Sequence, residues 1–154
     1  MKPQSTNHQS PSIGHIAQRM PVTRLLLITF ALACAGVAAE LLLLEHFEDW
    51  RQVIPLALLG MGMLVAAWHA RVRSKSAERM LFITLLLMAA SGIVGQVLHV
   101  LGNIEFEREA DPAIRTWPLI VESMMGATPA LAPGTMVLLA VVGYAYMLSG
   151  RSRG

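Results

Sequence analysis

The polar residues best suited to chemistry lie within otherwise apolar stretches of this 154-residue chain. Gln96, His99 and Asn103 are three and four residues apart, so a helix places them on one face. Glu40 lies near the end of an earlier apolar stretch. An unpaired carboxylate beside hydrocarbon costs about 1–3 kcal/mol, so we expect Glu40 to face inward and to hydrogen-bond Gln96 or His99. These four residues form the candidate polar layer.

A second group of polar residues has the ligand types of a divalent metal site. Carboxylate oxygens and imidazole nitrogens suit zinc, manganese or iron. The candidates are Glu45, His46, Glu48, Asp49, His99, Glu105 and Glu107, and we expect the last three to reach the level of the first four. On one helix, Glu45 and His46 point about 100° apart, so both bind one ion only if the helix ends between them. For this reason a solvated acidic rim with no metal is the favoured interpretation, metal binding is the alternative, and no other cofactor is expected.

The composition defines the class of protein that must position these residues. Fifty-five per cent of the residues are apolar, 14% are charged and the mean hydropathy is +0.54, whereas soluble domains carry about 25% charged residues. This excludes an ordinary soluble enzyme, a fibrous chain and a disordered chain. The single cysteine excludes an internal disulfide, a CxxC redox pair and a thiolate zinc site.

Four apolar runs are long enough to be membrane-spanning helices, since about 18–20 residues at 1.5 Å each cross most of the hydrocarbon. They cover residues 25–44, 53–70, 80–102 and 128–150. The runs do not alternate as barrel strands do. The predicted fold is therefore an all-α integral membrane protein, a four-transmembrane-helix bundle over residues 23–150. Residues 1–22, rich in Gln, Ser, Asn and Pro, are expected to be a disordered cytoplasmic tail, and residues 151–154 a cytoplasmic end.

The charges predict the orientation of these spans. One side of the predicted bundle carries nine of the twelve basic residues: Lys2, Arg19, Arg24, Arg71, Arg73, Lys75, Arg79, Arg151 and Arg153. The other side carries nine of the ten acids. The positive-inside rule then places both termini in the cytoplasm. A cleavable signal peptide ending near Cys34 is the alternative, but the apolar run continues to Leu44, beyond the length of such a peptide.

The two outer segments differ in length. Residues 45–52 are short and predict a tight hairpin, with Pro55 in the first turn of the second span. Residues 103–127 are longer, and Asp111 followed by Pro112 is typical of a helix start. A helical apolar face follows, made of Trp117, Ile120, Val121, Met124 and Met125. This predicts a short amphipathic helix at the outer interface, unless Pro118 breaks it into a re-entrant loop.

Small residues in the first three spans indicate close helix packing, because they let backbones approach in a membrane. They are Gly36, Ala39, Gly60, Gly62, Ser91, Gly92 and Gly95. His69 is interpreted as an interface residue. It is predicted to lie at the opposite membrane face from His99, so the two cannot ligate one haem.

Three segments resemble those of small four-span bacterial inner-membrane proteins that have no assigned function. They are residues 45–55 (EHFEDWRQVIP), 102–107 (GNIEFE) and 128–134 (TPALAPG). The resemblance extends over most of residues 24–148. It implies the same fold and membrane, and it transfers no activity and no binding site.

No phosphate-binding loop and no Ser/His/Asp signature of an enzyme is found in the sequence. We therefore expect a non-enzymatic accessory or assembly subunit with an acidic outer face, working in the lipid bilayer with a membrane-protein partner or as a homo-oligomer, and without nucleic acid. Two alternatives stay open. One is a small oligomeric proton-coupled transporter with Glu40 as the titrating group, and the other is a membrane metal-binding protein that uses the outer Glu/His/Asp cluster.

Overall fold

The computed structural model describes residues 21–126 and 131–151, which form five α-helices without a strand among them. In chain order these are α1 (Val22–Leu43), α2 (Trp50–Val72), α3 (Lys75–Ala110), α4 (Thr116–Met125) and α5 (Gly134–Arg151). Helices α1, α2 and α3 are long and apolar enough to cross a membrane, and α5 is a shorter apolar helix. The all-helical class is confirmed, and a membrane location agrees with these three helices.

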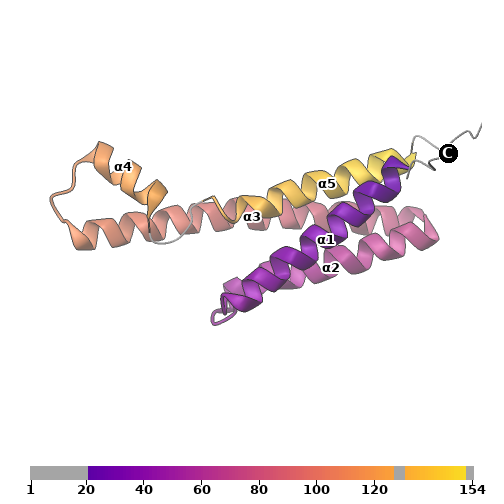
Figure 1. The fold of residues 1–154 in the computed structure, drawn as a ribbon, viewed down its shortest axis with the longest axis horizontal. Coiled ribbons are helices and arrows are strands. Elements are labelled where there is room, and N and C mark those ends of the chain that lie inside the picture. The colour runs from indigo at the N-terminus through magenta and orange to yellow at the C-terminus, as the bar shows by residue number, and fades with distance from the viewer. Residues whose placement is uncertain (1–20, 127–130, 152–154) are drawn as a thin grey trace, which may run out of the picture.

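The helices pack in neighbouring pairs. Helix α1 lies against α2 and α5, and α3 lies against α2, α5 and α4. Helices α1 and α2 diverge from α5 as they approach the turn that connects α1 to α2 (Figure 1). Phe30 of α1 is fully buried, and its ring lies where a side chain at Gly62 of α2 or Gly143 of α5 would stand. The two glycines therefore bring three helices together around one aromatic ring.

A tight turn ends α1 and begins α2. Glu45 has a left-handed backbone with φ of 51°, its N–H donates to the Leu42 carbonyl, and the His46 N–H donates to the Leu41 carbonyl. This is a Schellman motif with glutamate where glycine is usual. Asp49 and Gln52 then cap α2 with reciprocal side-chain-to-backbone hydrogen bonds.

These caps correct two sequence-based boundaries. Because the capping box starts α2 at Trp50, Pro55 is the sixth residue of the helix and not in its first turn. Because α1 ends at Leu43, the segment from Glu45 to Asp49 is a turn and not a helix. The rotation of about 100° expected between Glu45 and His46 on one helix therefore does not apply.

Helix α3 is much longer than the apolar run that predicted it. It has 36 residues, or about 54 Å at the helical rise, and it continues through residues 103–110. That segment is charged, which ended the apolar pattern, but Glu, Arg and Ala are strong helix formers. The region beyond Gly102 is therefore helical at first, and only residues 111–115 connect it to α4.

Helix α4 exists where an amphipathic helix was expected, but it begins later. The Asp111 N–H donates to the Glu107 carbonyl, and the Asp111 carboxylate accepts a hydrogen bond of 3.0 Å from the Ala113 N–H. Asp111 therefore ends α3, and the prediction that it starts the next helix is wrong. Pro118 is the third residue of α4 and does not break it, because the first-turn N–H groups have no partner inside a helix.

Helix α5 begins six residues after the predicted start of its span, and residues 128–130 of that span lie outside the described residues. Residues 131–133 form a turn in which the Gly134 N–H donates to the Leu131 carbonyl. Much of the surface of these helices is apolar: Leu32, Leu64 and Leu138 are each at least 66% exposed. Such a surface is unfavourable in water and suits a hydrocarbon environment.

Candidate functional site at the acidic end of the helices

The polar face of α3 is contacted by three different segments. Gln96, His99 and Asn103 occupy successive turns of α3, as their spacing indicates. Each meets another part of the chain: the start of α5, the α1–α2 turn and α4, respectively. We call the end of the helices that carries nine of the ten acidic residues the acidic end, and the opposite end the basic end. At the acidic end, the α1–α2 turn, α4 and the start of α5 all contact this face of α3.

Gln96 packs against the first residue of α5. A Cβ atom at Gly134 would lie 3.0 Å from Nε2 and 3.4 Å from Cδ of Gln96. Because Gly134 has no side chain, the side-chain amide of Gln96 occupies the space next to its Cα atom. One turn earlier, a Cβ atom at Gly92 would lie 2.8 Å from the Pro133 carbonyl oxygen, so α3 and the start of α5 are in backbone contact here.

His99 pairs with a second histidine. The rings of His99 and His46 have centroids 6.2 Å apart and are tilted by 51°. Both side chains are half-buried, and the Nδ1 atom of His99 is buried. The Schellman motif carries His46 past the end of α1 and places it beside α3. Two imidazoles from different elements can bind or relay a proton or hold a polar ligand between them.

The acids predicted as metal ligands do not join this pair. Among residues 21–126 and 131–151, no three His, Cys, Asp or Glu side chains are arranged to hold a metal ion. Asp49 caps α2, and Glu45 and Glu48 are exposed in the turn. Because α3 stays helical, Glu105 and Glu107 lie about 9 and 12 Å beyond His99 along its axis, and not at the level expected for them. Metal binding stays a prediction without a preformed site in this part of the chain.

The predicted hydrogen bond between Glu40 and the polar face of α3 is not present among the described residues. Its side chain is exposed, and no described residue forms a hydrogen bond or ion pair with it. Ala33, on the same side of α1, packs against the core, whereas Gly36, one turn later, has open space around it. This side of α1 therefore leaves the helix packing before Glu40, in agreement with the slant of α1 in Figure 1.

Asn103 joins α3 to α4 in a buried contact. Asn103 is 2% exposed and Ser123 of α4 is 1% exposed, and the Asn103 Nδ2 donates to the Ser123 carbonyl at 2.9 Å. A side chain at Gly126 would collide with Asn103, because a Cβ atom would lie 2.9 Å from its Cγ. The sequence identifies Asn103 as a polar residue of α3, but no sequence pattern indicates its hydrogen bond to α4.

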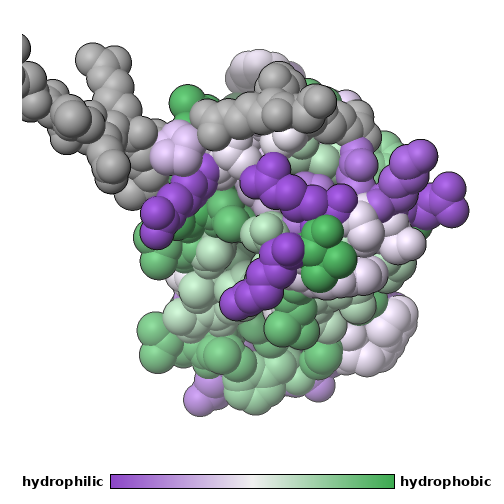
Figure 2. All heavy atoms as spheres, turned by 90° about the vertical axis from the view of Figure 1, so that its right-hand side faces the viewer, coloured by the Kyte–Doolittle hydropathy of each residue, from purple (hydrophilic) through white to green (hydrophobic). Residues whose placement is uncertain are grey.

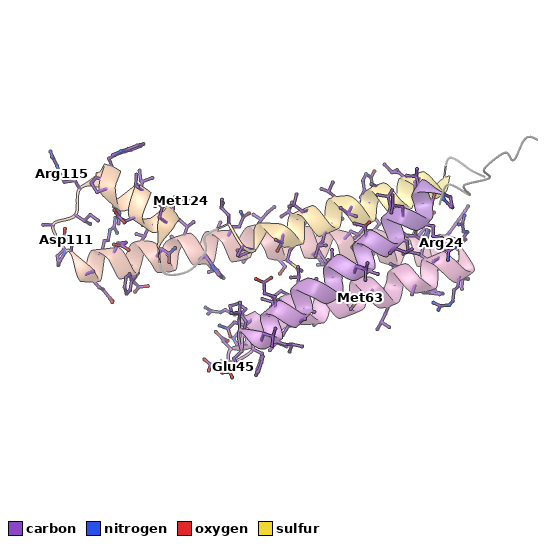
Figure 3. The ribbon with its side chains drawn as sticks, in the orientation of Figure 1. Arg24, Glu45, Met63, Asp111, Arg115 and Met124 are labelled. Atoms are coloured by element: carbon purple, nitrogen blue, oxygen red, sulfur yellow. The ribbon has the colours of Figure 1, made fainter. Side chains whose placement is uncertain are left out.

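The end of α3 and α4 extends beyond the α1–α2 turn. Figure 3 places Asp111, Arg115 and Met124 well past Glu45 along the direction of α3. We call residues 103–110 of α3 together with α4 the α3–α4 projection. Besides charged residues, it carries large apolar side chains that are 45–78% exposed: Phe106, Trp117, Ile120, Met124 and Met125.

A polar pair at the opposite, basic end was missed by sequence analysis, which interpreted His69 as an interface residue. Nδ1 of His69 in α2 lies 3.0 Å from the hydroxyl of Tyr146 in α5, and the rings meet edge to face. Tyr146 is 3% exposed. The two residues are 77 positions apart in the sequence. The only feature that could indicate their contact is that each lies close to the end of its helix.

Comparisons of the chain with family models, with curated proteins and with solved structures find no match. The resemblance of residues 45–55, 102–107 and 128–134 to four-span bacterial proteins stays a prediction.

Proposed function

We propose that the protein is a four-span protein of the bacterial inner membrane, with both termini cytoplasmic, that works as an accessory or assembly subunit and not as an enzyme. The observation that carries the proposal is the α3–α4 projection, which presents apolar side chains beyond the helix packing. The lipid bilayer and a second membrane protein are its proposed partners.

Helix α5 is proposed as the fourth span. Its 18 residues rise about 27 Å, close to the hydrocarbon thickness of about 30 Å. It packs beside α1 and α3, both long and apolar enough to cross a membrane. The basic residues at the ends of these helices support a cytoplasmic location of both termini.

The exposed face of α4 supports a docking role. Trp117, Ile120 and Met124 are spaced by three and four residues, so they form one stripe along the helix, and each is at least 45% exposed. Exposed apolar stripes with charged neighbours are typical of protein-binding surfaces. Because Asn103 and Ser123 hold the other side of α4, the stripe is presented in a fixed orientation.

The carrier hypothesis has less support. The side chain of Glu40 is exposed, so the packed helices of one chain do not enclose it. The accessory role requires only an oriented surface, and that surface is present.

Photocrosslinking in intact cells tests the docking role. A photoreactive amino acid replaces Ile120 in one variant and Glu122 in the other, both exposed and about 160° apart around α4. We expect a discrete adduct with another membrane protein from position 120 and little from position 122. Equal yields, or no protein adduct at position 120, would contradict the proposal.

A further inference from the structure

An apolar groove runs along the outside of α3 and α5, away from the candidate site. It has a volume of about 290 Å³. Leu85 and Ala140, both buried, lie at its base, and Phe82, Leu86, Val141 and Tyr144 form its sides. Those four side chains are 41–60% exposed, so the groove opens to the surroundings of the helices.

An aromatic pair lines the groove toward one end. The rings of Phe82 and Tyr144 have centroids 6.2 Å apart, and both residues lie toward the basic end of their helices. The Tyr144 hydroxyl supplies a polar atom beside an otherwise apolar surface, as tyrosines do at membrane interfaces.

Positive charge follows directly beyond this end. Lys75, Arg79, Phe82, Leu86 and Ala89 are spaced by three and four residues, so one face of α3 carries two basic side chains and then one wall of the groove. Both basic side chains are exposed. Glu78, the acid of the same turn, is half-buried and is engaged in an interaction of its own. Figure 2 looks at this end of the molecule and shows hydrophilic side chains gathered among hydrophobic ones.

We propose that the groove binds one acyl chain of an anionic phospholipid whose phosphate headgroup contacts Lys75 and Arg79. A volume of about 290 Å³ is at the lower limit of ligand pockets, which measure roughly 300–1,000 Å³, so it suits one chain and not a whole lipid. Basic residues beside a groove between membrane helices are the arrangement that recognises anionic headgroups. The inference rests on the proposed membrane location and does not depend on a protein partner.

A second copy of the chain is a poorer occupant. A parallel two-fold dimer through the groove would bring the same residues of both copies together. Lys75 and Arg79 would then face their own counterparts, and like charges at such distances repel. An anionic lipid supplies an acyl chain for the apolar groove and a negative charge for Lys75 and Arg79.

Native mass spectrometry of the purified full chain in a non-ionic detergent tests this site. The probes are phosphatidylglycerol, which is anionic, and phosphatidylcholine, which is zwitterionic. Two basic contacts are expected to favour phosphatidylglycerol about thirty-fold. The double variant Lys75→Gln with Arg79→Gln should lose this preference and keep its phosphatidylcholine binding. The matched control, Arg24→Gln with Arg71→Gln, removes two exposed charges of the same end and should keep the preference.

A second pair of variants tests the groove itself. Ala89→Phe adds a ring inside the groove and should reduce binding of both lipids, whereas Ala90→Phe adds the same ring to the exposed neighbouring position and should not. Equal lipid preference in the two charge-removal variants, equal effects of the two phenylalanines, or a lipid-free dimer mass would overturn the proposal. Because the isolated protein is used, absence of a protein partner does not affect the result.

Discussion

The side-chain amide of Asn103 donates a 2.9 Å hydrogen bond to the backbone carbonyl of Ser123, and this buried contact fixes α4 against α3. Gly126 allows the approach, because any side chain there would occupy the space of Asn103. A buried hydrogen bond favours a single arrangement of the two helices, because any other arrangement would leave a buried donor and acceptor without partners. This hydrogen bond therefore helps to fix the orientation of the exposed face of α4.

We expect Asn103→Leu to release α4 without unfolding the other helices. Leaving the Ser123 carbonyl unsatisfied costs about 1–3 kcal/mol, which corresponds to a rise of roughly 5- to 150-fold in exchange of the α4 amides. Hydrogen–deuterium exchange of residues 116–125 measures it, with exposed Glu105→Ala as the control. Unchanged exchange in α4 would show that Asn103 does not hold it.

Two glycine-to-alanine variants should have opposite effects. At Gly92 a Cβ atom would lie 2.8 Å from the Pro133 carbonyl oxygen and 3.0 Å from Met136 and Val137, so Gly92→Ala should destabilise by about 1–3 kcal/mol. At Gly36 nothing lies within 4 Å, so Gly36→Ala should be neutral or stabilise by up to about 1 kcal/mol. Thermal unfolding in detergent compares them, and equal melting temperatures would contradict the packing.

This contrast shows how far the sequence predicts packing. The small residues of the first three spans are equivalent in the sequence. In the structure, Gly62, Gly92 and Gly95 closely approach other segments of the chain, whereas nothing lies within 4 Å of a Cβ atom at Gly36 or Gly60. The length and apolarity of α1, α2 and α3 followed from composition, because both are local properties. Which face of a helix meets which neighbour is not local, so it could not be predicted from spacing.

The candidate site has the same limit. The spacing of Gln96, His99 and Asn103 correctly describes one helix, but it contains no information about the three segments that cover them. The approach of His46 to His99 depends on the left-handed residue Glu45, a conformation that a glutamate in a polar sequence does not signal. Likewise, the charged residues after Gly102 end the apolar run, but α3 continues to Ala110.

The Schellman motif predicts the effect of replacing Glu45. A left-handed backbone costs a residue with a side chain about 1–2 kcal/mol, and glycine avoids this strain but loses more entropy on folding. Glu45→Gly should therefore stabilise by up to about 1 kcal/mol, whereas Glu45→Val should destabilise.

Melting curves of these two variants, recorded with and without added zinc or manganese, measure both effects and also test the metal hypothesis. A metal-dependent shift lost in both variants would restore Glu45 as a ligand.

The orientation of the helices can be tested with reporter fusions. The proposed topology makes a reporter that works only in the periplasm active after Glu109, which lies in the α3–α4 projection, and silent after Ser76. A fusion after Gly154 should also be silent. Activity at Ser76 would reverse the orientation, and the proposed lipid site would then belong to the outer leaflet.

Glu40 gives the most direct test of the polar layer. A glutamate that hydrogen-bonded Gln96 or His99 would leave those groups unsatisfied when replaced by leucine, and stability would fall. The side chain of Glu40 is exposed, so Glu40→Leu should instead be neutral or stabilise, since an exposed carboxylate beside hydrocarbon is costly. Asn103→Leu, which removes a buried hydrogen bond, provides the destabilised reference in the same detergent melts. A fall in melting temperature for Glu40→Leu as large as that of Asn103→Leu would mean that Glu40 has a buried partner in the folded protein, and would return it to the candidate site.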